Sequence, residues 1–266
     1  MIKKNYSKTA FLLTLIFLLQ ANSASAQINT EKYRKYYSDE TGFLFNIATT
    51  FSLKAGNTEY SAYKGGGRID YNGKKFDTFL VGSFEYKNTE EKKLENQGFL
   101  HLRGITHLSD RTNWEVFIQR QYDEFIDLNS RNVAGTGIKY RLIEFVSKKD
   151  STNTVDMSVS TGLMYEAENY NLDGGTINQY HWRSTNFISI DWLVQKKLNL
   201  TGVLYYQPAL KDFNNFRITS EAGLEFAIAK SVHFIFALSY RYNSQPSTDV
   251  KKFDLSIDNG IRIEIK

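Results

Sequence analysis

Charged side chains at every second position are the residues of this sequence best suited to a chemical role. Glu221 and Glu225, for example, are separated by an even number of residues, so both carboxylates lie on one face of an extended segment. In a water-filled channel such side chains select solutes by charge. In a narrower interior they instead pair with one another and fill the space, and the even mixture of signs favours this second arrangement. The candidate residues are Arg68, Arg103, Arg183, Arg217, Glu221, Glu225, Asp254, Asp258 and Arg262.

Ser231 and His233 are the residues that come closest to a catalytic pair. Their spacing puts both on one face of a strand, where a histidine base can activate a serine nucleophile. A phospholipase-like hydrolase of this kind requires both side chains to face lipid, and no adjacent Asn or Asp orients the histidine. We therefore expect a protein that is not an enzyme, with a lipid-acting hydrolase as the alternative.

No motif for a metal, a nucleotide or another cofactor stands out in the sequence. His101 and His107 share one strand face, but six strand residues at about 3.3 Å each separate them by roughly 20 Å. The stretch from Gly67 to Lys74 is one residue too long for a phosphate-binding loop, and no Ser or Thr follows it. We expect no cofactor and no metal.

The candidate charges belong to a longer pattern of extended segments. Between Val232 and Tyr242, for instance, aliphatic and aromatic residues occupy every second position. Alternation over about ten residues is typical of membrane-spanning β-barrel strands. The sequence therefore predicts an all-β fold, an antiparallel transmembrane β-barrel of about 12 strands (10–12). The strands are expected near 43–54, 59–71, 75–87, 95–108, 111–123, 131–146, 153–167, 179–194, 198–207, 216–228, 232–242 and 253–265.

The connections between these segments alternate in length. Short turns such as Asn72-Gly73, a favoured hairpin pair, alternate with connections that are longer on average. Short periplasmic turns and long external loops are the rule for outer-membrane barrels. The longest predicted loop runs from Glu168 to Asn178, and surface binding through such external loops is a further functional hypothesis.

The first 26 residues have the features of a secretory signal. Three lysines precede a short apolar run, and Ala24-Ser25-Ala26 fits the small-residue cleavage rule. Removing the three lysines leaves 30 basic and 29 acidic residues, which gives no sign of nucleic-acid binding. We expect a signal peptide at 1–26, a short periplasmic segment at 27–42 and a barrel domain at 43–266, in the outer membrane of a Gram-negative cell.

Several short motifs, in order and spacing, resemble an uncharacterised family of outer-membrane barrels, domain of unknown function 481. They are Ala55-Gly56-Asn57-Thr58, Tyr122-Asp123-Glu124-Phe125, Ile126-Asp127-Leu128, Gly135, Gly137, Tyr140, Arg141-Leu142-Ile143, Pro246 and the run from Asp249 to Asp254. One family member is named a salt-induced outer membrane protein. The resemblance covers about 43–266 and implies an outer-membrane barrel with no established activity. The chain departs from outer-membrane barrels generally by ending in Lys266 rather than in an aromatic residue.

Together these observations predict a non-enzymatic outer-membrane protein. Two forms remain open, a narrow solute pore and an envelope-stress or salt-stress barrel whose interior is mostly filled. The expected partners are outer-membrane lipids and lipopolysaccharide, the outer-membrane assembly machinery and a small solute, with no nucleic acid. A monomer is expected.

Overall fold

The computed structural model describes residues 41–55, 59–89, 93–147, 153–195, 197–229, 232–247 and 250–263. The predicted signal peptide, most of the predicted periplasmic segment, Ser231 and the last three residues lie outside this described part of the chain. Within it, no helix is long and apolar enough to cross a membrane.

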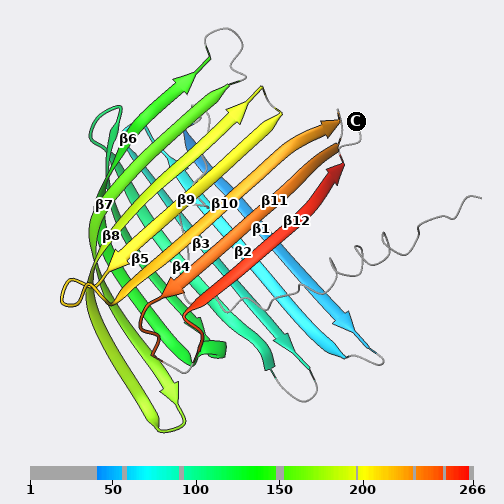
Figure 1. The fold of residues 1–266 in the computed structure, drawn as a ribbon, viewed down its shortest axis with the longest axis vertical. Helices are drawn as coiled ribbons and strands as arrows, with labels where there is room; N and C mark the ends of the chain where they lie inside the picture. The colour runs from blue at the N-terminus through cyan, green and yellow to red at the C-terminus, as the bar shows by residue number, and fades with distance from the viewer. Residues whose placement is uncertain are drawn as a thin grey trace, which may run out of the picture.

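The described chain forms a single sheet of 12 strands, in which each strand pairs with the next in the sequence (Figure 1). Every pairing is antiparallel, which confirms the predicted all-β, antiparallel fold of about 12 strands. The strands are β1 Gly42–Lys54, β2 Tyr60–Asn72, β3 Phe76–Asn88, β4 Lys93–His107, β5 Thr112–Asp123, β6 Leu128–Val146, β7 Thr154–Leu172, β8 Gly175–Val194, β9 Leu198–Pro208, β10 Phe216–Ala229, β11 Val232–Asn243 and β12 Phe253–Ile263.

The alternation of side chains along each strand separates the two faces of the sheet. On β8, Arg183, Thr185 and Phe187 are buried on the inner face. Their neighbours Trp182 and Ile188 are exposed on the outer face. Because the side chains of a strand point alternately to opposite faces, the register fixes the face of each residue away from the register shifts, such as the one between Arg141 and Ile143.

The prediction of a long loop from Glu168 to Asn178 is wrong. β7 continues to Leu172 and β8 starts at Gly175, so the segment is a two-stranded ribbon with a tight turn. Gly175 has a φ of +124°, a conformation that favours glycine. The ribbon escaped the hydropathy pattern because one of its faces is entirely polar, with Asn169 paired with Asn178 and Asn171 paired with Thr176.

A smaller correction applies to the predicted loop from Glu124 to Ser130. Residues Glu124–Ile126 form a 3₁₀ turn, η2, and β6 starts already at Leu128. The Asp123 carboxylate accepts a hydrogen bond from the backbone N–H of Phe125 at 3.1 Å, which caps the turn.

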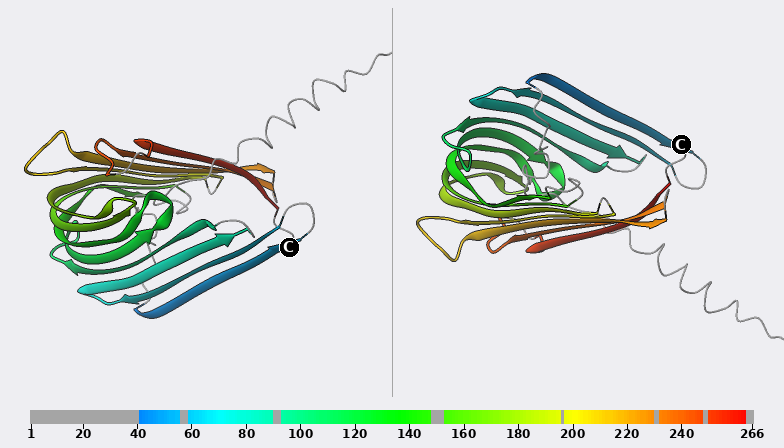
Figure 2. Two further views of the ribbon diagram at one scale, coloured as in Figure 1. Left: turned by 90° about the horizontal axis from the view of Figure 1, so that it is seen from below. Right: turned by 90° about the horizontal axis from the view of Figure 1, so that it is seen from above.

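The sheet curls so that its edge strands β1 and β12 turn towards each other (Figure 2). No ladder joins these two strands among the described residues. Both edges are highly exposed, with Ile47 of β1 at 85% and Ile261 of β12 at 66%. The most densely buried part of the inner face therefore lies away from the edges, on β4 to β10.

Candidate functional site

The charged side chains of the inner face fall into two zones. We call the buried zone the ionic core, which comprises Arg103, Glu115, Arg131, Glu166, Glu168, Arg183 and Arg217. We call the zone next to the sheet edge the seam wall, which comprises Glu221, Glu225, His233, Arg241, Asp254, Asp258 and Arg262 on β10, β11 and β12.

Glu166 lies at the centre of the ionic core. Its side chain has no solvent exposure, and its carboxylate accepts hydrogen bonds from Arg131, Arg183 and Arg217. The Arg183 Nε lies 2.5 Å from Glu166 Oε2. Arg131, Glu166, Arg183 and Arg217 belong to β6, β7, β8 and β10, so one carboxylate ties four strands together.

The arginines around Glu166 have further partners. Arg217 Nη2 donates to both carboxylate oxygens of Glu168, at 2.8 and 2.9 Å. Arg183 donates to the Gln207 carbonyl at 3.3 Å and to the Asn215 side-chain oxygen at 2.9 Å. Guanidinium groups that are buried need such multiple partners, since an unpaired buried charge is strongly destabilising.

A second branch of hydrogen bonds extends this network towards β4 and β5. Arg103 forms a 2.9 Å ion pair with Glu115 and donates from Nε to His101 Nε2 at 3.3 Å. His101 Nδ1 in turn lies 3.1 Å from Gln119 Oε1. With Nε2 as the acceptor from Arg103, Nδ1 is the ring nitrogen that can donate to Gln119. Gln119 then donates to Gln121 at 2.8 Å.

The branch rejoins the carboxylate cluster at Arg131, whose Nη1 donates to Gln121 Oε1 at 3.1 Å. The aromatic rings of Phe79 and Phe117 stack on the two sides of His101, each with a centroid distance of 5.8 Å. The network is therefore continuous from Glu115 to Glu168 and is fixed by packing as well as by charge.

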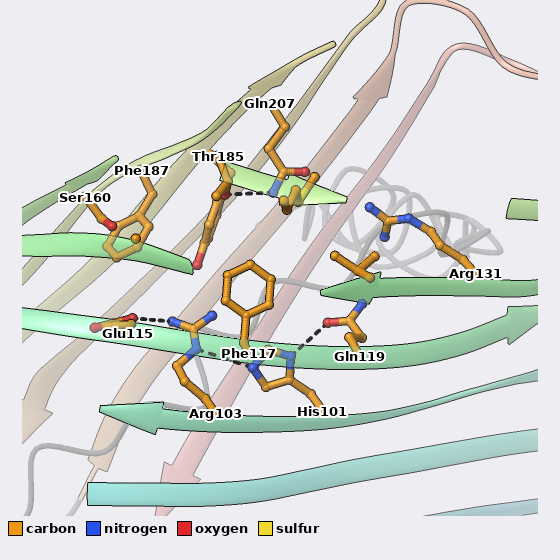
Figure 3. A pocket seen from close by; sticks show the side chains of 14 residues that line it. His101, Arg103, Glu115, Phe117, Gln119, Arg131, Ser160, Thr185, Phe187 and Gln207 are labelled. Atoms are coloured by element: carbon orange, nitrogen blue, oxygen red, sulfur yellow. Dashed lines mark hydrogen bonds and ion pairs between the residues drawn. The ribbon is translucent and has the colours of Figure 1, made fainter. Parts of the chain in front are cut away.

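The space left inside the ionic core is small. A cavity of about 40 Å³ lies between His101, Arg103, Phe187 and Tyr205, and Figure 3 shows His101, Arg103 and Phe187 among the side chains that line it. At about 10–15 Å³ per water, it holds roughly three water molecules. This zone is filled by protein and has no room for a solute of the size of a sugar.

The β11–β12 connection covers the ionic core at the end where η2 lies. Val250 of this connection packs against Ile126, Leu128 and Tyr170. The Ser247 side chain, from the same connection, is hydrogen-bonded to Tyr170. These contacts hold Ser247 and Val250 against β6, β7 and η2, close in sequence to Glu168.

The side chains of the seam wall are more exposed than those of the ionic core. Arg262 contacts Glu225, with side-chain exposures of 46% and 28%. His233 Nδ1 lies 3.2 Å from the same carboxylate. The closest approach of Arg241 to Glu221 is 3.9 Å, at the limit of an ion pair.

The nine candidate charges are thus divided between the zones. Arg103, Arg183 and Arg217 belong to the ionic core, and Arg68 pairs with Asp70 on β2 nearby, with its guanidinium 4.2 Å from the centre of the Phe79 ring. The seam wall contains the other five, namely Glu221, Glu225, Asp254, Asp258 and Arg262.

The sequence analysis missed Arg131 and Glu168. Glu168 lay in the predicted loop, and Arg131 stood at the first position of a predicted strand. A signal was present, because each is two residues from an inward-facing residue, Val133 and Glu166 respectively. Extending the alternation by one more step would have placed both on the inner face.

The hydrolase hypothesis needs His233 on the outer face, and the structure places it on the inner face. His233 pairs with Ala227 and with Arg262 in the ladders, and its ring contacts Glu225. Ser231 lies outside the described residues. No group of three or more potential metal ligands among His, Asp and Glu occurs within the described part of the chain.

The central position of Glu166 leads to a prediction about the stability of the folded protein. Glu166→Gln removes the charge shared by three buried arginines and should destabilise the folded protein by about 3–5 kcal/mol. The matched control Glu225→Gln removes a partly exposed pair and should cost only about 0–1 kcal/mol. Denaturant unfolding of both variants in lipid vesicles measures the difference, and equal losses would contradict a central role for Glu166.

Comparison with known proteins provides a family but no activity. No curated protein matches the sequence. A solved structure described as the NanC porin in a rhombohedral crystal form superposes with a TM-score of 0.43 at 9% identity, covering 84% of this chain and 99% of that one. The family profile described as "Protein of unknown function, DUF481" matches residues 47–262. Since this match spans most of the chain, the protein belongs to the DUF481 family.

Proposed function

We propose that this protein is a non-enzymatic barrel of the outer membrane that forms a narrow solute pore along its seam wall. The observation that carries the proposal is the division of the interior into a filled ionic core and a more open charged wall. The outer face supports the membrane placement, because exposed large aliphatic or aromatic side chains occur on 11 of the 12 described strands. The outward side chains of β11, such as Phe234 and Phe236, are partly exposed.

A membrane-embedded sheet must have no open edge, because unpaired backbone groups in hydrocarbon are very costly. With 12 strands in antiparallel order, β1 and β12 run in opposite directions. Both also have apolar residues at alternate positions, such as Phe45 and Ile47 on β1 and Ile257 and Ile261 on β12. We therefore expect these two strands to pair in the bilayer and complete the barrel.

Cysteine cross-linking tests this closure, since the chain has no cysteine of its own. Single cysteines at 47, 49 or 51 of β1 are combined with cysteines at 257, 259 or 261 of β12. Antiparallel pairing keeps the sum of the two residue numbers constant along a ladder. All pairs that oxidise readily in membranes should therefore share one sum, and scattered sums or no cross-links would contradict closure.

Closure would leave a path beside the seam wall. The inward residues of β1 there are small, including Ala48, Thr50 and Ser52. On β10 to β12 the wall contributes four carboxylates and two guanidiniums, namely Glu221, Glu225, Asp254, Asp258, Arg241 and Arg262. An excess of negative charge on one wall favours the passage of cations.

Conductance of the protein in planar bilayers tests the pore. The full chain, expressed in bacteria and extracted from their membranes, should give discrete current steps. Asp254→Asn with Asp258→Asn should shift the cation-to-anion permeability ratio towards anions by about twofold. Glu115→Gln is the matched control, because it removes one carboxylate from the ionic core and should leave the ratio unchanged. A folded protein that gives no current would contradict the pore and favour a filled stress barrel.

The same proposal fixes the partners that we expect. Outer-membrane phospholipids and lipopolysaccharide would contact the apolar outer face, and the assembly machinery would insert the barrel. Because the seam closes within one chain, we propose that the protein acts as a monomer. Permeability measurements with different solutes would identify the small solute that passes.

A further inference from the structure

One arginine stands out on the outer face of the sheet. Among the strand positions whose side chains are described, Arg120 of β5 is the one charged residue that the register assigns to this face. In the ladders it stands opposite Leu100 and Asn132. It is exposed and has no hydrogen bond or ion pair with the described residues. A cation on an apolar, membrane-facing surface is costly unless it meets an anion or reaches the interface.

Two apolar grooves run beside Arg120 on the outer face. The first has a volume of about 670 Å³ and crosses β1 to β5. The second has a volume of about 450 Å³ and crosses β3 to β7, where Leu80, Ile118 and Tyr165 line it. Arg120 and Leu100 line both grooves, so the arginine lies where they meet.

Glycines create the first groove. The outward positions at its floor are Gly65, Gly67, Gly82 and Gly98. The Phe84 ring lies over Gly65 so closely that an added Cβ would be 2.4 Å from it. Tyr122 covers Gly98 in the same manner, at 2.8 Å. Phe84 and Tyr122 thus form walls over Gly65 and Gly98, and the backbone at Gly67 and Gly82 is left as the floor of the recess.

The chemistry of this surface matches one class of ligand. Grooves of several hundred Å³ with apolar linings accept hydrocarbon chains. A guanidinium binds phosphate oxygens through paired, charge-assisted hydrogen bonds. Arg120 lies three residues, roughly 10 Å of strand, from the β5 end that adjoins η2. Chains in two grooves with an anion between them correspond to a phospholipid or a related phosphorylated lipid.

We propose that Arg120 and the two grooves bind a phosphate-bearing membrane lipid, with the phosphate on Arg120 and an acyl chain in each groove. This inference rests on the membrane placement proposed above. It adds a specific lipid site, at one position of the outer face, to the general contact of a barrel with its bilayer.

The test is native mass spectrometry of the full chain extracted from bacterial membranes in detergent. The protein is titrated with dimyristoyl phosphatidic acid, with dimyristoylglycerol and with inorganic phosphate. Phosphatidic acid should bind at one molecule per chain. Dimyristoylglycerol should bind about tenfold more weakly, since it lacks the charged hydrogen bonds. Inorganic phosphate should neither bind measurably nor compete.

Two variants remove the two halves of the site. Arg120→Gln should weaken phosphatidic acid binding about tenfold. Gly67→Leu should weaken it by filling the first groove. A Cβ at Gly67 makes only ordinary contacts, at 3.6 Å from the Asn46 carbonyl, so this variant should fold. Circular dichroism verifies folding, and equal binding by wild type and both folded variants would overturn the proposal.

An arginine moved to another outward position tests whether lipid binding needs the two grooves or only a positive charge on the outer face. Ser220→Arg, added to Arg120→Gln, puts a cation on the outer face of β10, opposite Leu204 and Tyr240 and away from both grooves. Binding should stay weak, and its recovery would overturn the proposal, as would competition by inorganic phosphate.

Intact lipid binding without conductance would contradict the pore alone, whereas conductance without lipid selectivity would contradict the lipid site alone.

Discussion

The buried carboxylate of Glu166 is the constraint on which the interior of this protein depends. Three guanidiniums would be untenable inside the sheet without it, and its contacts hold β6, β7, β8 and β10 in one arrangement. Arg183 also reaches the carbonyls of Gln207 and Asn215, which ties the β9–β10 connection to the same centre. The ionic core is therefore a fixed filler rather than a set of mobile charges.

Because the ionic core leaves little space, the seam wall is the part of the interior where charged side chains can meet water. The seam wall retains exposed charges because its strands adjoin the sheet edge, where β1 contributes small side chains. Electrostatic selection requires charges that meet water, and the seam wall, with Arg262 at 46% exposure, satisfies that condition better than Arg183 at 1%. The division would allow one barrel to combine a rigidly packed core with the proposed pore.

Much of the fold could be predicted from the sequence, because alternating hydropathy marks strands with one apolar face. The pattern failed at the ribbon from Glu168 to Asn178, because one face of the ribbon is entirely polar. The candidate charges were visible as inward positions, but their partners were not. Arg217 reaches Glu166 across two intervening strands, and only the curvature of the sheet brings them together. The position of Arg120 between two apolar grooves likewise could not be predicted from the sequence, because it depends on how the neighbouring strands pair.

The division of the interior can be tested most directly by the reactivity of single cysteines in membranes. Ser239→Cys and Ser256→Cys lie opposite each other on the seam wall, whereas Thr185→Cys and Thr219→Cys are buried near the ionic core. A charged methanethiosulfonate reagent should modify the first pair rapidly and the second pair slowly. Equal rates at all four positions, or protection of the seam wall, would contradict the account.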